Sequence, residues 1–292
     1  MMKAYMQRKM DLINEQLTKM YPENQALNTA LAQSMNYSLM AGGKRLRPIL
    51  IMAAADALGV DGEKFLRVAT SIEFIHTYSL IHDDLPAMDN DDYRRGKLTN
   101  HKVFGEDLAI LAGDALLTMA FEIIATDKDI DDKTKVKLIT ELSIASGAEG
   151  MVGGQVIDMQ SENKAIDMAT LKKMHAAKTG ALFCAAIRMG AILAGANDKQ
   201  LADLTQYARQ FGLAFQITDD ILDVTGDEAT IGKPVGSDEK NHKSTYVTLG
   251  SLESAKKLAK EAVDRAKEAL NEFDDNADFL RSLVDYLITR NK

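Results

Sequence analysis

Residues 201–223 read LADLTQYARQFGLAFQITDDILD, and this stretch decides the fold class. Its apolar residues recur every three or four positions, the spacing that buries one face of an α-helix. They are Leu201, Leu204, Ala208, Phe211 and Phe215. An earlier segment has the same spacing at Phe65, Val68, Ala69, Ile72 and Ile75. Both stretches therefore predict amphipathic helices.

The rest of the chain also favours helices. Its four prolines are Pro22, Pro48, Pro86 and Pro234, so none falls between positions 87 and 233, and good helix formers are abundant. No alternating strand and no Asn-Gly hairpin signal is present. We expect one all-α domain spanning 1–292, with roughly ten or more helices around a single core. Breaks are expected at 41–43, 59–62, 87–100, 126–132, 150–154, 195–198 and 226–242.

Composition excludes several classes of protein. The 292 residues carry 35 Lys+Arg against 43 Asp+Glu, a net charge of −8 that argues against a nucleic-acid binder. The single cysteine, Cys184, excludes an internal disulfide and is expected to pack in the core. The N-terminal segment has charges every few residues, unlike a signal peptide. The most apolar run, CAAIRMGAILAGA, is short and contains Arg188, so we expect no membrane span and a cytoplasmic protein.

The helix at 201–223 ends in the acidic sequence DDILD. Successive helical residues turn by 100°, so Asp219, Asp220 and Asp223 share one arc of the helix surface. Asp219 also continues the apolar stripe, one turn beyond Phe215. A carboxylate on a core-facing stripe is costly unless it is paired or binds a metal ion.

A second acidic cluster lies in HDDLPAMDNDDYRRG at 82–96. Asp83 lies two helical turns after His76 on an otherwise apolar helix. Pro86 should end that helix, because proline lacks an N–H and clashes with the preceding turn. Asp89 can then return from the following loop towards Asp83 and Asp84.

Two such clusters are typical of a magnesium site. Carboxylates without His or Cys suit a hard cation, and Mg²⁺ combines one or two carboxylates with waters and phosphate oxygens. A solvated acidic helix end explains one cluster, but less readily two. Paired Glu-x-x-His motifs of a di-iron bundle are the rival, at Glu73…His76 and Glu239…His242. The second of these motifs lies in GSDEKNHKS, without apolar periodicity, and is poorly placed to face a bundle core.

Basic residues follow glycines or acids at several places. GGKRLRP at 42–48 sets Lys44, Arg45 and Arg47 at a predicted helix start, where glycine backbone and arginine suit anions. Taken alone, this motif is equally explained as a surface basic cluster. The other candidate cations are Arg94, Arg95, Lys178 beside Thr179, Lys233 and Lys243. Together with the acidic clusters they predict two anionic substrates, one bound through metal and one without it.

These motifs occur in a recognisable order from about 36 to 246. GGKRLRP, DDLPAMD, RRG, GGQ, KTG, FQITDDILD and GKPVGSD together resemble the trans-isoprenyl diphosphate synthases, and among them the bacterial farnesyl diphosphate synthases. The resemblance implies a large helical bundle around a central cavity. It also implies head-to-tail condensation of isopentenyl diphosphate with dimethylallyl and then geranyl diphosphate, in a homodimer with three Mg²⁺ ions in each active site.

The resemblance also assigns residues. Metal ligands would be Asp83, Asp84, Asp89, Asp219, Asp220 and Asp223. The allylic diphosphate would contact Arg94, Lys178 and Lys233, with Thr179 and Gln216 nearby, and Lys243 is carried over from a further lysine motif. Isopentenyl diphosphate would lie against Lys44, Arg47, His76 and Arg95. His76 also has a structural interpretation as a hydrogen-bonded core histidine, and His82 is interpreted as structural.

Residues just before the first acidic cluster are implied to set product length. Helical geometry places Ser79 beneath Asp83 and Tyr78 to its side. In the family, an aromatic residue at the position of Tyr78, with the insertion seen here as Pro86-Ala87, accompanies a fifteen-carbon product. We therefore expect farnesyl diphosphate. The alternatives are a twenty- or ten-carbon product, a terpene cyclase, which would not need GGKRLRP, and a non-catalytic partner subunit.

Overall fold

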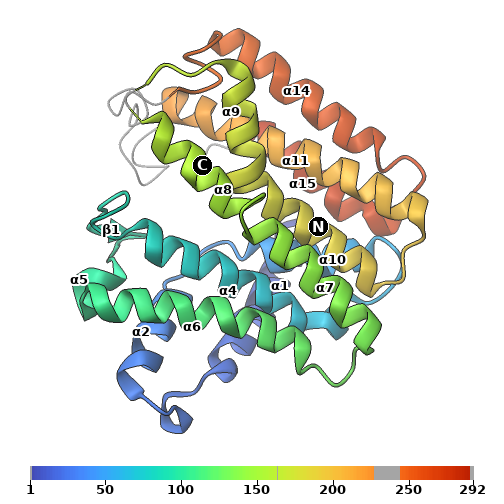
Figure 1. The fold of residues 1–292 in the computed structure, drawn as a ribbon. Coiled ribbons are helices and arrows are strands. Elements are labelled where there is room, and N and C mark those ends of the chain that lie inside the picture. The colour runs from blue at the N-terminus through green and yellow to red at the C-terminus, as the bar shows by residue number, and fades with distance from the viewer. Residues whose placement is uncertain (1, 163, 227–243, 290–292) are drawn as a thin grey trace. The chain divides into compact units, whose positions relative to one another are not determined.

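The computed structural model describes residues 2–162, 164–226 and 244–289, and almost all of their regular structure is helical (Figure 1). This confirms the all-α fold class. The α-helices are α1 (Met2–Met20), α2 (Thr29–Leu39), α3 (Leu46–Asp56), α4 (Leu66–Asp83), α5 (Asn100–Phe104), α6 (Glu106–Ala125), α7 (Asp132–Ser146), α8 (Met151–Ser161), α9 (Met168–His175), α10 (Ala181–Leu193), α11 (Asp198–Thr225), α14 (Leu252–Glu268) and α15 (Asp278–Thr289).

The chain divides into two compact units, and each is described by itself. The first consists mainly of Lys3–Met52 and Asp61–Thr140, and the second of Ala53–Val60 and the chain from Glu141 onward. A single domain over 1–292 stays a prediction.

Helix α4 is the centre of the first unit. It lies alongside α6 and also contacts α2 (Figure 1). Ile72, Phe74 and Ile75 are fully buried on it, and buried residues occur on all its sides. A helix that is apolar all round must be surrounded by protein. The predicted segment 65–75 is therefore a core helix rather than an amphipathic one.

Helix α11 is the centre of the second unit, between α10 and α14 (Figure 1). The Phe183 ring of α10 meets the rings of Phe211 and Phe215 edge-on, at centroid distances of 5.2 and 5.1 Å. The hydroxyl of Tyr207 donates to the Leu280 carbonyl of α15 at 2.9 Å. Burying each of these aromatic side chains contributes roughly 1.5–3 kcal/mol. The amphipathic helix predicted over 201–215 is confirmed.

Most predicted breaks fall between observed helices, but two boundaries differ. The glycines of 150–154 were expected to interrupt a helix, whereas α8 begins at Met151 and runs through Gly153 and Gly154. A break was not expected between α8 and α9, around 162–167, yet the chain leaves the helix there. The glycines are required for packing, because a Cβ atom at Gly154 would clash with the backbone of Lys178.

The expectation of no strand or hairpin is corrected by a short hairpin. Strand β1 (Tyr93–Arg94) pairs antiparallel with β2 (Lys97–Leu98). The two turn residues, Arg95 and Gly96, have φ of +53° and +75°. Positive φ at both positions is the pattern of a type I′ turn, which normally carries Asn-Gly. Arginine in the first position concealed this turn from the sequence pattern.

Two stretches are long and apolar enough to cross a membrane by length and composition alone. They are Glu106–Ala125 and Met168–Leu193, and 39% and 44% of their most apolar windows are buried in the protein. The core helices of soluble proteins meet the same criterion. Both stretches pack against other helices here, α6 against α4 and α10 against α11.

Candidate active site

The first acidic cluster begins where α4 ends, at Asp83. The predicted effect of Pro86 is confirmed, because the helix stops three residues before it. The chain then folds back, and the Asp89 amide donates to the Asp83 carbonyl at 2.9 Å. Further along, the Thr99 hydroxyl donates to the Asp91 carbonyl at 2.8 Å and closes the loop. Asp83 is half-buried and Asp89 is exposed.

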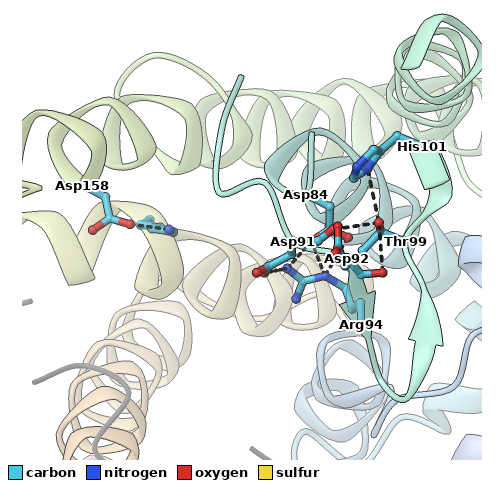
Figure 2. A network of polar contacts seen from close by, with 8 residues as sticks. Asp84, Asp91, Asp92, Arg94, Thr99, His101 and Asp158 are labelled. Atoms are coloured by element: carbon cyan, nitrogen blue, oxygen red, sulfur yellow. Dashed lines mark hydrogen bonds and ion pairs between the residues drawn. The ribbon is translucent and has the colours of Figure 1, made fainter. Parts of the chain in front are cut away.

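Asp84 is the buried acid of this cluster, with 3% of its surface exposed. Figure 2 shows Arg94 lying between Asp84 and Asp91. Arg94 Nε donates to both Asp84 oxygens, at 2.7 and 2.9 Å, and Nη2 donates to Oδ1 at 2.5 Å. Burial raises the pKa of Asp84, while Arg94 acts in the opposite direction. Hairpin β1–β2 thus places a cation directly on one predicted metal ligand.

In the basic motif GGKRLRP, Arg45 is buried, whereas Arg47 is half-buried and Lys44 is exposed. Arg45 lies just before α3, is 2% exposed, and has φ of +48°. Its guanidinium donates to Glu73 at 2.7 Å, to Asn14 at 2.9 Å and to the Leu39 carbonyl at 2.5 Å. Arg45 is therefore a structural anchor. The same contact engages Glu73, the first residue of the rival di-iron pattern.

Arg47 and Arg95 form a pair of mutually repelling positive charges, and the ring of His76 lies within reach of both. Burial lowers the pKa of Arg47 to about 10, with Arg95 adding to the shift. Burial also lowers the pKa of His76 well below its usual value, and Arg47 and Arg95 are the next causes. The pKa of Arg95 is lowered too, again mainly by burial. Positive charges crowded in this way favour a bound anion. Lys44 is exposed, just before α3.

Of the two glycines preceding these cations, Gly43 lies against the guanidinium of Arg95. Arg95 Nη1 donates to the Gly42 carbonyl. A Cβ atom at Gly43 would lie 2.6 Å from Arg95 Nη1, and both Gly42 and Gly43 have positive φ. Only glycine meets both requirements at position 43. The sequence motif is therefore explained by a close approach between two loops.

The second acidic cluster lies at the end of α11. Asp220 is 6% exposed, and its Oδ2 accepts the Tyr246 amide at 2.8 Å. Asp219 is exposed, and Asp223 is half-buried. The expectation that Asp219 extends the core-facing stripe is wrong. The acid turned towards the protein interior is its neighbour, Asp220.

A cavity of about 200 Å³ in the second unit collects many of the predicted residues. Asp219, Asp220, Gln216, Lys178 and Thr179 all line it. Acids and a lysine around one cavity suit a metal-bound anion. The residues of the first acidic cluster and of GGKRLRP belong to the other unit.

Asp158 also lines this cavity, and the sequence interpretation missed it. The ammonium of Lys178 donates to Asp158 Oδ2 at 2.5 Å. Asp158 lies one turn after Gly154 on α8, and Gly154 packs against the Lys178 backbone. The i, i+4 spacing from the GGQ motif was the available signal.

Lys178 and Thr179 lie on a π-helical turn, Ala176–Gly180, inserted between α9 and α10. Such turns are rare and occur often at functional sites. Two glycines allow neighbouring helices to approach it. Gly154 of α8 touches the Lys178 backbone, and a Cβ atom at Gly212 of α11 would lie 3.3 Å from Gly180 Cα.

Two predicted substrate-binding residues, Lys233 and Lys243, lie outside the described residues. So do Glu239 and His242 of the rival di-iron pattern. The chain-length candidates Tyr78 and Ser79 are on α4. Tyr78 is 6% exposed and its ring meets the His82 ring edge-on at 5.7 Å. The Ser79 hydroxyl donates to the His76 carbonyl at 2.9 Å. His82 is near the Ile110 carbonyl, at 3.0 Å, which fits its structural interpretation.

The donor atoms of both clusters fit Mg²⁺ in kind. Within the described residues, no three His, Cys, Asp or Glu side chains are grouped so as to hold a metal ion. Mg²⁺ does not require such a group, because it usually takes one or two carboxylates and completes its shell with water and phosphate oxygens. Asp219 and Asp220 on one cavity, and Asp83 beside Asp84, are carboxylate sets of that size.

Comparison with known proteins gives one consistent result. The polyprenyl synthetase family matches residues 28–285. The farnesyl diphosphate synthase of Micrococcus luteus is 49% identical over 97% of this chain and 96% of its own length. The geranylgeranyl diphosphate synthase of Cyanophora paradoxa is 46% identical over 99% and 96%.

A solved structure agrees with these relatives. The FPP/GFPP synthase of Zymomonas mobilis, in its apo form, superimposes with a TM-score of 0.88 and 40% identity over 98% of both chains. The likeness therefore extends over the fold as well as the motifs. Prenyl synthases of this family generally use Mg²⁺. The chain belongs to the polyprenyl synthetase family and is a trans-prenyl diphosphate synthase, a prenyltransferase.

Proposed function

We propose that this prenyltransferase condenses isopentenyl diphosphate with dimethylallyl diphosphate and then with geranyl diphosphate, and releases (2E,6E)-farnesyl diphosphate. The observation that carries the product length is Tyr78, a buried aromatic side chain on α4 five positions before Asp83. A bulky side chain there would form the floor of the pocket for the growing chain, with Ser79 beside it. Relatives named for fifteen- and twenty-carbon products are 49% and 46% identical, so the choice rests on this residue.

The two diphosphates would be bound by different chemistry. The allylic diphosphate would lie against Lys178, Thr179 and Gln216, with Arg94, Lys233 and Lys243 as further contacts. The metal ligands would be Asp83, Asp84, Asp89, Asp219, Asp220 and Asp223. The cavity of about 200 Å³ that joins Lys178 to Asp219 and Asp220 supports this arrangement.

Isopentenyl diphosphate would be held without metal, by Lys44, Arg47, His76 and Arg95. The lowered pKa values of Arg47 and Arg95 support an anion site, since an anionic head group would relieve the repulsion between their charges. His76 would contribute as a neutral hydrogen-bond donor, because its pKa is well below the usual value.

Bound Mg²⁺ would supply charge neutralisation for the departing diphosphate. Arg94 and Lys178 would bind the same oxygens and stabilise the charge that develops on them. Cleavage of the allylic carbon–oxygen bond leaves its electron pair on the diphosphate and gives an allylic carbocation, which the double bond of isopentenyl diphosphate attacks. A proton is lost to the released diphosphate, and the product is five carbons longer. The buried apolar residues of α4 and α11 would exclude water, which would otherwise trap the cation.

Four further proposals follow from family membership. The chain would act as one polyprenyl synthase domain over 1–292, form a homodimer, and work in the cytoplasm with three Mg²⁺ ions in each active site. A terpene cyclase would not require the second anion site around Arg47, which argues against that alternative.

The test is a product analysis. The purified protein is incubated with labelled isopentenyl diphosphate and dimethylallyl diphosphate, with Mg²⁺ or with EDTA, and the products are separated by chain length. We expect a Mg²⁺-dependent fifteen-carbon product. Tyr78→Ala should shift the products to longer chains, whereas Tyr286→Ala, a half-buried tyrosine of α15, should not. A mainly twenty- or ten-carbon product from the unaltered protein would overturn the farnesyl assignment.

A further inference from the structure

The second unit contains another cavity, of about 440 Å³, separate from the cavity that holds Asp219 and Asp220. It lies between the segment from α9 to α10 and the middle of α11. Ala176, Ala181 and Leu213 supply apolar wall, and Cys184 is also part of the lining. A volume of this size falls within the range of small-molecule sites. None of the residues assigned to catalysis or substrate binding lines it.

Three polar atoms of the lining have no hydrogen-bond partner in the described structure. They are His175 Nδ1, Gln210 Oε1 and the hydroxyl of Tyr246, and each atom is buried. Tyr246 as a whole is 1% exposed. Burial lowers the pKa of His175 to about 4, so its imidazole is neutral near pH 7. Buried polar groups without partners are uncommon, because each costs roughly 1–3 kcal/mol. Three such groups on the lining of one cavity leave hydrogen-bonding capacity that a polar occupant could use once the side chains turn towards it.

The lining also has a definite charge. Lys172 of α9 and Arg209 of α11 both line the cavity, and both residues are exposed. No acidic side chain is among the described residues that line it. The combination of apolar wall, internal polar atoms and exposed cations complements an amphipathic anion, with its apolar chain inside and its head group near Lys172 and Arg209.

The cavity shares parts with the candidate diphosphate site. His175 lines both cavities. Ala176 and Gly180 line the larger cavity, whereas Lys178 and Thr179 of the same π-helical turn line the smaller one. Tyr246 packs its ring against His175 at 5.6 Å, and its amide donates to Asp220. An occupant of the larger cavity would therefore contact the back of the segment that carries Lys178.

We propose that this cavity is a second binding site, which takes a small amphipathic anion and is coupled to diphosphate binding through His175, Tyr246 and the turn Ala176–Gly180. Carboxylate and phosphate head groups share the required chemistry. Coupling of this kind is reciprocal, so diphosphate with Mg²⁺ changes the affinity for the amphiphile by the same factor as the reverse.

The chain provides its own reporter, because Cys184 is its only cysteine and lines the cavity. The experiment measures the rate of Cys184 alkylation in the full-length protein with octanoate, octyl phosphate or octyltrimethylammonium, each below its micelle concentration. The two anions distinguish a carboxylate from a phosphate ligand, and the cation is the matched control with the same chain. We expect an anion at ten times its Kd to slow alkylation about tenfold, and the cation to have little effect.

Titration calorimetry with the same compounds measures binding without depending on thiol reactivity. Lys172→Glu and Arg209→Glu should each weaken binding of the anions severalfold. Lys257→Glu, an exposed lysine of α14 outside the lining, is the matched control and should leave it unchanged. Addition of inorganic diphosphate with Mg²⁺ should shift the Kd of the anion. Absence of binding, equal binding of the cation, or anion binding insensitive to both charge reversals would overturn the proposed anion site. An unchanged Kd with diphosphate would overturn the coupling.

Discussion

The two acidic clusters look alike in sequence but hold their carboxylates differently. In the first, the buried Asp84 is covered by the side chain of Arg94, which donates to both of its oxygens. In the second, the buried Asp220 accepts the backbone amide of Tyr246, and the exposed Asp219 beside it lines a cavity. One acid is paired with a side-chain cation and the other with the main chain.

This difference indicates that one acid can change its hydrogen-bond partner, whereas the other anchors a segment of the chain. An arginine side chain can leave a carboxylate and bind diphosphate oxygens instead. Its guanidinium can donate two parallel hydrogen bonds to a carboxylate or to a phosphate group. A backbone amide cannot leave without moving its whole segment. We therefore expect Asp84 to exchange its partner during the reaction cycle, and Asp220 to keep the segment at 244–249 in place throughout.

The largest expected effect is on catalysis. Asp84→Asn and Asp219→Asn should each lower kcat by about 10²–10³-fold, because each removes a charge that, in the proposed function, would hold metal and diphosphate. Steady-state kinetics with saturating Mg²⁺ measures this. Asp264→Asn, an exposed aspartate of α14, is the control and should remain within about twofold. Normal activity in either cluster variant would show that one cluster suffices.

The next effect is acid sensitivity, through the histidine beside each cluster. Burial lowers the pKa of His175 to about 4, and burial followed by Arg47 lowers that of His76 well below its usual value. The unfolded chain binds these protons at a higher pH, so stability is present above about pH 6.5 and is lost as pH falls. For His175 the loss amounts to roughly 3 kcal/mol by pH 4.

Urea unfolding of the wild type and of His76→Gln and His175→Gln, from pH 7.5 downward, measures this loss. Each variant should lose less stability on acidification than the wild type. For His175→Gln most of the difference should be present by pH 4. Parallel curves for wild type and variants would contradict the burial of these rings.

A smaller effect concerns folding at the second cluster alone. Asp220→Ala should lower the free energy of unfolding by about 1–3 kcal/mol, because it leaves the buried Tyr246 amide without an acceptor. Asp219→Ala, one residue earlier and exposed, should change it by about 0.5 kcal/mol or less. Chemical denaturation compares the two. Equal losses would mean that the amide finds another acceptor.

The smallest effect concerns metal binding without substrate. Arg94→Gln should increase the affinity of the protein for Mg²⁺ alone severalfold, because the cation that competes for Asp84 is removed. Lys178→Gln should change this affinity less, since Lys178 is paired with Asp158 rather than with Asp220. Mg²⁺ titrations followed by thermal unfolding measure both variants.

The sequence predicted the features that depend on local patterns. The spacing from Leu201 to Phe215 and the end of α4 before Pro86 are consequences of helix geometry, and both are confirmed. It could not show that Arg45 is a buried anchor, because its partner Glu73 lies 28 residues away along the chain. Nor could it show which of Asp219 and Asp220 is buried, since that depends on the contact of Asp220 with the amide of Tyr246.

Glycine was the residue most often misread. Gly153 and Gly154 were taken as a break, yet they belong to a helix that must pass close to the Lys178 backbone. Gly96, in contrast, completes a turn whose other residue is an arginine at positive φ. A glycine can permit either unusual dihedral angles or a close contact, and only the neighbouring segment distinguishes the two.

The π-helical turn Ala176–Gly180 has a consequence for the evolution and engineering of the chain. Such a turn amounts to one extra residue in an otherwise continuous α-helix from Met168 to Leu193. Loss of a single codon there would restore regular helical phase and rotate everything on one side by about 100° relative to the other. Lys178 and Thr179 could then no longer keep their present direction while both flanking helices kept theirs. A length change of one residue at this position would thus impair catalysis while the flanking helices could still fold.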